Sequence, residues 1–195
     1  MQCAQSWQMQ VNSANDAVAE TELIRSGLAG DQQALSALLT RYERPLYLLC
    51  RGMLRHSEDA EDAVQETLLK ALNALATFRF HSSFRTWLFR IAIRSCLDRK
   101  QSKRADPAWS EVSPDTVSPT HSPETTVLRQ MRMLDALAVL QPRQRALVLL
   151  KELHGCSIAE IAETLSWNQK KVHNELSKAR SVLAVWRARE EGNQS

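Results

Sequence analysis

The sequence predicts an all-α protein of two small helical domains joined by a flexible, proline-rich linker. Apolar residues recur at spacings of three and four along most of the chain, which is typical of amphipathic helices. Only 5 Gly and 6 Pro occur in 195 residues, so helices can run without interruption. Four of those prolines fall in residues 105–123, a segment rich in Ser and Thr that holds no Lys or Arg. Such a composition is typical of an extended linker.

These features divide the chain into five parts. We expect an N-terminal extension over residues 1–20, an N-terminal domain over 21–104, the linker over 105–123, a C-terminal domain over 124–190 and a tail over 191–195. Each domain is near the lower size limit for independent folding, so each should be a compact helical bundle.

Four helices are expected in the N-terminal domain. Apolar stripes at residues 23–28, 35–53 and 60–75 predict the first three, and Gly30 should end the first of them. Ser82 or Ser83 can cap the fourth, which should run toward Lys100.

The fourth helix mixes aromatic and basic residues. One face carries Phe84, Trp87, Leu88, Ile91 and Ala92, which periodicity assigns mainly to the core. Phe89 suits either core packing or an exposed stacking surface. The other faces carry Arg85, Arg90, Arg94 and Arg99, which are suited to holding the phosphates of a nucleic-acid strand.

A helix-turn-helix pattern is expected near the end of the C-terminal domain. Two helices, over 127–140 and 143–153, should precede it, with Pro142 in the first turn of the second. Ser157 and Glu160 have capping-box spacing, residues 166–167 make a turn, and Asn168 can cap the last helix. The outer face of that helix is basic and carries an amide, as DNA-reading helices do.

The chemistry of that face fits duplex DNA. Lys170, Lys171 and Lys178 can neutralise phosphates, which provides affinity without sequence information. Asn174 can read an adenine edge, and Gln169 or His173 can add base contacts. The alternative is an ordinary helical hairpin with a lysine-rich, solvated face.

Charge is unevenly spread along the chain, although the net charge is only +3. Residues 79–104 hold eight basic residues against one acid, and residues 167–189 hold six against one. Residues 58–66 hold five acids and no base. Two basic segments and one acidic segment suggest two polyanion contacts and one protein contact, unless they are merely solvated faces.

Catalytic, metal and membrane sites are not expected. No Ser/His/Asp set, phosphate loop or metal-ligand spacing occurs, so we expect no catalytic residue, metal or cofactor. Cys50, Cys96 and Cys156 have apolar neighbours and should be buried free thiols. No apolar run approaches the roughly 20 residues that span a bilayer, and no secretory signal starts the chain. A cytoplasmic protein without membrane insertion is expected.

Three stretches, in order, resemble bacterial RNA polymerase sigma factors of the extracytoplasmic-function (ECF) group. DAEDAVQETLLKAL (59–72) is similar to the family's helix that binds core polymerase. FRFHSSFRTWLFRIAIRSCLD (78–98) is similar to the loop and helix that melt and read the minus-ten promoter element. LQPRQRALVLLKELHGCSIAEIAETL (140–165), with the helix after it, is similar to the domain that reads the minus-thirty-five element.

The resemblance assigns residues to three contacts. The residues expected to bind core polymerase are Asp59, Glu61, Asp62, Gln65 and Glu66. Those expected to contact minus-ten DNA are Arg79, Phe80, His81, Ser82, Ser83, Arg85, Arg90 and Arg94. Those expected to contact minus-thirty-five DNA are Asn168, Gln169, Lys170, Lys171, His173, Asn174 and Lys178. The implied partners are core RNA polymerase, promoter DNA and a cognate anti-sigma factor.

This sequence departs from the family at several positions. Relatives often carry Gly and an acid where Phe80 and His81 stand, and often Gly where Ser166 stands. Two other functions are considered. A free-standing helix-turn-helix regulator would leave the first two stretches unexplained. A structural helical adaptor would have basic surfaces but no role in nucleic-acid binding.

Overall fold

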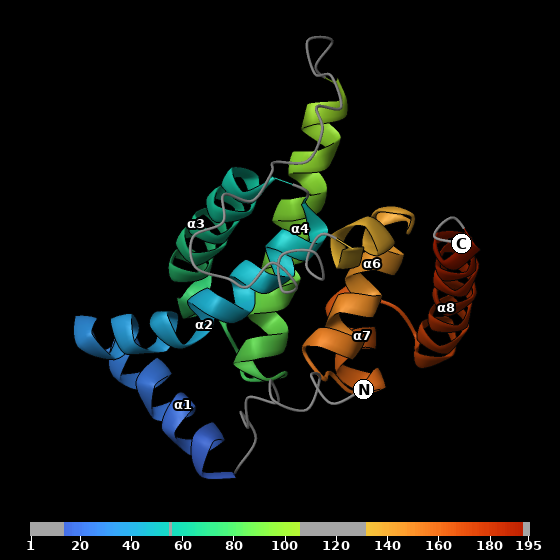
Figure 1. Cartoon of the computed structure of the whole chain (residues 1–195). Coiled ribbons are helices and arrows are strands. Elements are labelled where there is room, and N and C mark those ends of the chain that lie inside the picture. The colour runs from blue at the N-terminus through green and yellow to red at the C-terminus, as the bar shows by residue number, and fades with distance from the viewer. Residues whose placement is uncertain (1–13, 55, 106–131, 193–195) are drawn as a thin grey trace.

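The computed structural model describes residues 14–54, 56–105 and 132–192, and within these ranges it contains helices and turns but no strand (Figure 1). The all-α prediction is confirmed. Most of the expected N-terminal extension and linker, and residues 193–195, lie outside the described ranges.

The N-terminal domain consists of α1 (Ala14–Leu28), α2 (Gln32–Met53), α3 (Ser57–Ala74), the 3₁₀ turn η2 (Leu75–Thr77) and α4 (Phe84–Ala105). Gly30, at φ 101°, follows the end of α1. The Asp31 side chain then caps α2 by accepting from Gln33 N at 2.9 Å and Ala34 N at 3.1 Å. Helix α2 packs against α1, α3 and α4, and the side chains between them form the core of this domain.

The described part of the C-terminal domain starts with a helical segment over residues 132–138, and the first residues of the helix expected over 127–140 lie outside the described ranges. It continues with α6 (Pro142–Val148), the π-helical turn η3 (Leu149–Leu153), α7 (Ile158–Leu165) and α8 (Gln169–Gly192). Pro142 lies in the first turn of α6, as predicted. The wider η3 turn, in which His154 N donates to Leu149 O at 3.1 Å, interrupts the single helix expected over 143–153.

The two domains pack directly against each other. The end of α2 contacts α6 and η3, and α4 lies beside α7 (Figure 1). Arg145 of α6 is buried and donates to Met53 O of α2 at 3.0 Å, and also to the carbonyls of Leu137 and Ala138. Separate domains were predicted, but this contact between them was not.

Among the helices that the structure describes, none is long and apolar enough to cross a membrane. Cys50, Cys96 and Cys156 are free and buried, which confirms the prediction for these three thiols. Burial raises the pKa of Cys156.

Candidate nucleic-acid interface

Helices α7 and α8 form the predicted helix-turn-helix. Ser157 Oγ accepts from Glu160 N at 3.2 Å while the Glu160 carboxylate accepts from Ser157 N at 2.8 Å, so the capping box is complete. Ser166 ends α7 in the left-handed region at φ 55°. Asn168 Oδ1 accepts from Lys171 N at 2.8 Å and so caps α8, as predicted. Both caps and the turn depend only on residues that are close together in the chain, which explains why the sequence was enough to predict them.

The outward face of α8 carries the polar side chains predicted to meet duplex DNA. Val172, Leu176 and Ala179 are buried beneath it. Every residue assigned to the minus-thirty-five element is exposed: Asn168, Gln169, Lys170, Lys171, His173, Asn174 and Lys178. The three lysines among them are therefore all on the solvent-exposed side of α8.

Two of the three lysines on this face already have intramolecular partners. Lys171 lies over the Trp167 ring, 4.7 Å from its centroid. Lys178 pairs with Glu175 at 2.8 Å, and Gln144 donates to the same carboxylate at 2.8 Å. Both hydrogen bonds lower the pKa of Glu175, and the one from Lys178 has the larger effect. Glu175 therefore neutralises part of the basic face, and a contact between Lys178 and a phosphate would require Lys178 to leave this carboxylate.

The loop before α4 is held in an unusual backbone conformation. Phe80 has φ 56°, a left-handed value that glycine adopts easily and a bulky residue does not. Phe80 is 46% exposed, and the only ring partner of its side chain among the described residues is Phe78, at 4.8 Å between centroids. Glycine, which the resemblance led us to expect at this position, would adopt this backbone without strain. In this chain a strained, exposed aromatic side chain stands in its place.

The remaining loop residues surround Phe80. Arg79 and His81 are exposed, and Ser82 is half-buried. Ser83 is the residue that caps α4, because its Oγ accepts from Thr86 N at 3.1 Å. The loop therefore presents three large exposed side chains beside the start of the basic helix.

Helix α4 buries the face that the periodicity predicted. Phe84, Leu88 and Ala92 are buried, and Trp87 and Ile91 are half-buried. Phe89, which the sequence left undecided, is 1% exposed. Its ring makes an edge contact with His154 of the C-terminal domain, at 4.7 Å between centroids.

Two of the arginines predicted to hold the melted strand contact the C-terminal domain. Arg85 donates to the carbonyl oxygen of His154 and, at 3.0 Å, to Cys156 Sγ. Arg90 donates to Glu163 O at 2.9 Å. Burial, and then the charge of Arg85, lower the pKa of His154 to about 4. Arg94 is exposed.

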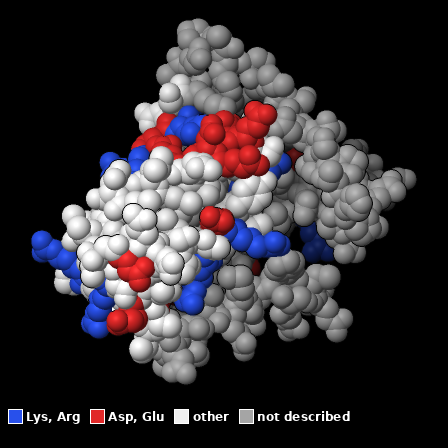
Figure 2. Space-filling model, turned by 90° about the vertical axis from the view of Figure 1, so that its left-hand side faces the viewer, with Lys and Arg blue, Asp and Glu red and all other residues white. Residues whose placement is uncertain are grey.

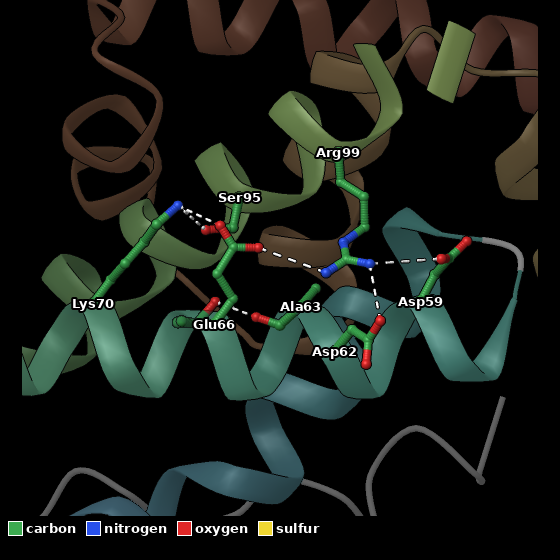
Figure 3. Close-up of polar contacts among 8 residues, drawn as sticks. Asp59, Asp62, Ala63, Glu66, Lys70, Ser95 and Arg99 are labelled. Carbon is green, nitrogen blue, oxygen red and sulfur yellow. Dashed lines mark hydrogen bonds and ion pairs between the residues drawn. The ribbon is translucent and has the colours of Figure 1, made fainter. Parts of the chain in front are cut away.

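The acidic residues predicted to bind polymerase gather on α3, on the face shown in Figure 2. Arg99 of α4 reaches into this group (Figure 3). It lies 3.1 Å from Asp62, 3.8 Å from Asp59 and 3.7 Å from Glu66. The periodicity assigned Arg99 to a nucleic-acid strand, but the packing of α4 along α3 directs it to the acids. The sequence holds no local signal for this contact.

The other members of the acidic group differ in exposure. Glu61, Asp62 and Gln65 are exposed, whereas Asp59 is nearly buried. Glu66 pairs with Lys70 at 2.6 Å, and Lys70 also donates to Ser95 Oγ at 3.1 Å (Figure 3). The side chains most accessible to a partner are therefore Glu61, Asp62 and Gln65.

Comparison with known proteins identifies the family. The family model for Sigma-70 region 2 matches residues 38–105, and that for Sigma-70 region 4 matches residues 130–183. The ECF RNA polymerase sigma factor SigM of Mycobacterium tuberculosis is 35% identical over 167 residues, which cover 85% of this chain and 83% of SigM. This chain belongs to the ECF sigma factors.

Other relatives agree with this membership. The RNA polymerase sigma factor YlaC of Bacillus subtilis is 35% identical to this ECF sigma factor over 133 residues, 66% of this chain and 77% of YlaC. The solved structure of CnrH in complex with the cytosolic domain of CnrY matches with a TM-score of 0.69 and 25% identity, over 86% of this chain and 96% of that one. The sigma factor RpoE of Bartonella quintana, solved with the anti-sigma factor NepR, shares the fold at a TM-score of 0.62 and 22% identity, over 76% of this chain and 92% of RpoE.

Proposed function

We propose that this ECF sigma factor initiates transcription through three separate surfaces, each on a different helix. The observation that carries the proposal is the α7–α8 helix-turn-helix, whose second helix exposes Lys170, Lys171 and Asn174 together. A helix of this kind fits the major groove of the minus-thirty-five duplex. The lysines would meet phosphates there and the amide a base edge.

The second surface is the loop before α4 together with the arginines of that helix. Single-stranded DNA is bound by aromatic rings on which bases stack and by cations that follow the phosphates. The exposed ring of Phe80, next to Arg79 and His81, supplies the first element. Arg85, Arg90 and Arg94 supply the second. We assign this surface to the melted minus-ten strand.

The third surface is the acidic group on α3, which suits a basic partner. We assign Glu61, Asp62 and Gln65 to direct contact with core polymerase, because they are its accessible members, and we assign Asp59 and Glu66 to the support of that surface. The polymerase supplies the catalytic chemistry, so the factor acts in the cytoplasm beside it.

Since RpoE was solved with an anti-sigma factor, we propose that a cognate anti-sigma protein controls this chain as well.

The test is transcription with purified core polymerase on genomic fragments. The proposal expects specific start sites that appear only when the factor is added. If the factor forms no complex with core polymerase and no fragment yields a specific start, the proposal is wrong. The factor alone should bind promoter DNA weakly, whereas a free-standing helix-turn-helix regulator would bind it tightly without polymerase.

A paired variant tests the polymerase surface. Asp62→Ala with Gln65→Ala should weaken core binding on the order of tenfold, because interface contacts are concentrated in a few residues. Thermal stability should change little, because both side chains are exposed and Arg99 keeps Asp59 and Glu66 as partners when Asp62 is removed. Glu22→Ala with Gln33→Ala removes one acid and one amide from exposed positions elsewhere and is the matched control. Equal weakening by both pairs would contradict the assignment.

A further inference from the structure

A single acid interrupts the basic side of α8. Among residues 167–189, which hold six basic residues, Glu175 is the only acid. It follows Lys171 by four residues and precedes Lys178 by three, and both spacings bring side chains together on the surface of a helix. The exposed side that we assign to the minus-thirty-five duplex therefore carries a carboxylate between two of its lysines.

The carboxylate of Glu175 is held from two directions. Gln144 Nε2 of α6 donates to its Oε2 at 2.8 Å, and Lys178 Nζ donates to its Oε1 at 2.8 Å. Because α6 packs against α8, the bond from Gln144 ties the carboxylate to the body of the domain. The Glu175 side chain is 19% exposed, whereas the Lys178 side chain is 66% exposed. Lys178 can therefore turn away into solvent, while Glu175 stays in place.

The lysines of this side differ in what their charges meet. Lys171 lies over the Trp167 ring, an arrangement that leaves its charge unneutralised. Among the described residues, only Lys178 of the three has a carboxylate within ion-pair distance. The lowered pKa of Glu175 keeps that carboxylate charged at neutral pH. A phosphate that reached Lys178 would have to displace Glu175 and would then lie beside a fixed charge of its own sign.

We propose that Glu175 sets the affinity of α8 for duplex DNA, because its carboxylate, fixed by Gln144, withholds Lys178 from the phosphates. This inference rests on the proposed function of α8 and adds a residue that weakens the contact. Phosphate contacts provide affinity without sequence information. With one such contact fewer, a larger share of the binding free energy comes from base contacts.

The experiment uses the full chain and a fluorescent duplex oligonucleotide of mixed sequence, because the proposed effect does not depend on a promoter. Affinity is measured over a series of salt concentrations for the wild type, Glu175→Gln, Lys178→Ala and the double variant. Glutamine has nearly the size of glutamate and its amide oxygen still accepts a hydrogen bond, so the substitution removes the charge and keeps the packing. Urea unfolding checks that each variant is folded.

Glu190→Gln is the matched control. It removes the same charge from an exposed position of the same helix. At a rise of about 1.5 Å per residue, Glu190 lies about 22 Å further along α8 than Glu175. This separation is about twice the Debye length at roughly 0.1 M salt, so the control reports what a distant charge contributes.

We expect Glu175→Gln to raise the duplex affinity on the order of tenfold at about 0.1 M salt. The slope of log affinity against log salt should steepen by about 1, because one more lysine then neutralises a phosphate. Glu190→Gln should do neither. Lys178→Ala should cost more affinity in the Glu175→Gln background than in the wild type, because only there is Lys178 released from the carboxylate.

Three results would overturn the inference. These are an unchanged affinity and slope in Glu175→Gln, equal losses from Lys178→Ala in the two backgrounds, and a lower affinity in Glu175→Gln. The last would mean that the carboxylate itself contacts DNA. Transcription with core polymerase separates this inference from the proposed function. Specific starts with an unchanged duplex affinity would remove only the role of Glu175, whereas a gain in duplex affinity without any specific start would support that role and contradict the proposed function.

Discussion

The exposed ring of Phe80 gives the sharpest test of the minus-ten surface. Two replacements separate the two properties of this residue, its aromatic face and its left-handed backbone at φ 56°. Phe80→Gly removes the ring and suits the backbone, whereas Phe80→Ala removes the ring and keeps the backbone strain.

The magnitudes follow from the contacts of Phe80. A base stacked on an aromatic side chain contributes about 1–3 kcal/mol, so both variants should lose roughly tenfold or more in affinity for the melted strand. Both also lose the ring contact with Phe78, at 4.8 Å between centroids, which costs each about the same stability. The left-handed backbone should make the alanine variant less stable than the glycine variant, by about 1 kcal/mol.

The affinity is measured with holoenzyme on an oligonucleotide that carries the minus-ten non-template segment. Stability is measured by urea unfolding of the factor alone. Wild-type affinity in both variants would refute the stacking role. Equal stability of the alanine and glycine variants would refute the strained loop, even if the affinity falls as expected.

Three other perturbations test the remaining surfaces. Burial and Arg85 lower the pKa of His154 to about 4, whereas an unfolded histidine titrates near 6.5, so the unfolded state takes up the extra proton as the pH falls. The free energy of unfolding, measured by urea titration, should therefore drop by about 2 kcal/mol from about pH 7 to about pH 5. The His154→Gln variant should not show this drop. Lys170→Ala should reduce the slope of log affinity against log salt for holoenzyme on a promoter by about 1 without altering base preference, and a changed preference would mean that Lys170 reads bases. Arg99→Gln removes the shared cation from the acidic group and should cost about 1 kcal/mol of stability, more at low salt, whereas Arg189→Gln at an exposed position should not.

The features that the sequence predicted correctly are those set by neighbours along the chain. The capping box at Ser157 and Glu160, the cap at Asn168 and the turn at Ser166 each depend on residues within one turn of one another. The buried face of α4 follows in the same way from its 3.6-residue period. Such patterns are local, so a single sequence is enough to reveal them.

The features that the sequence missed depend on how the helices pack. Arg99 lies among the acids because α4 runs along α3, and Phe89 is buried because the C-terminal domain covers it. Neither partner is near these residues in the chain. The strain at Phe80 was missed for a different reason, because φ depends on the whole loop and an aromatic residue gives no hint of a positive value.

The chemistry of arginine explains why the interdomain contact is compatible with a role in DNA binding. A guanidinium donates in a plane to oxygen acceptors, and it bonds to phosphates, carboxylates and carbonyls with similar geometry. Arg85 and Arg90 therefore keep their hydrogen bonds when they exchange the carbonyls of His154 and Glu163 for phosphates. For Arg85 the exchange gains the full negative charge of a phosphate in place of the partial charge of a carbonyl, whereas Arg90 also gives up the Glu163 carboxylate, which lies 3.4 Å away. The contacts of Arg85 and Arg90 with the C-terminal domain are therefore no argument against the proposed contacts of the same side chains with DNA.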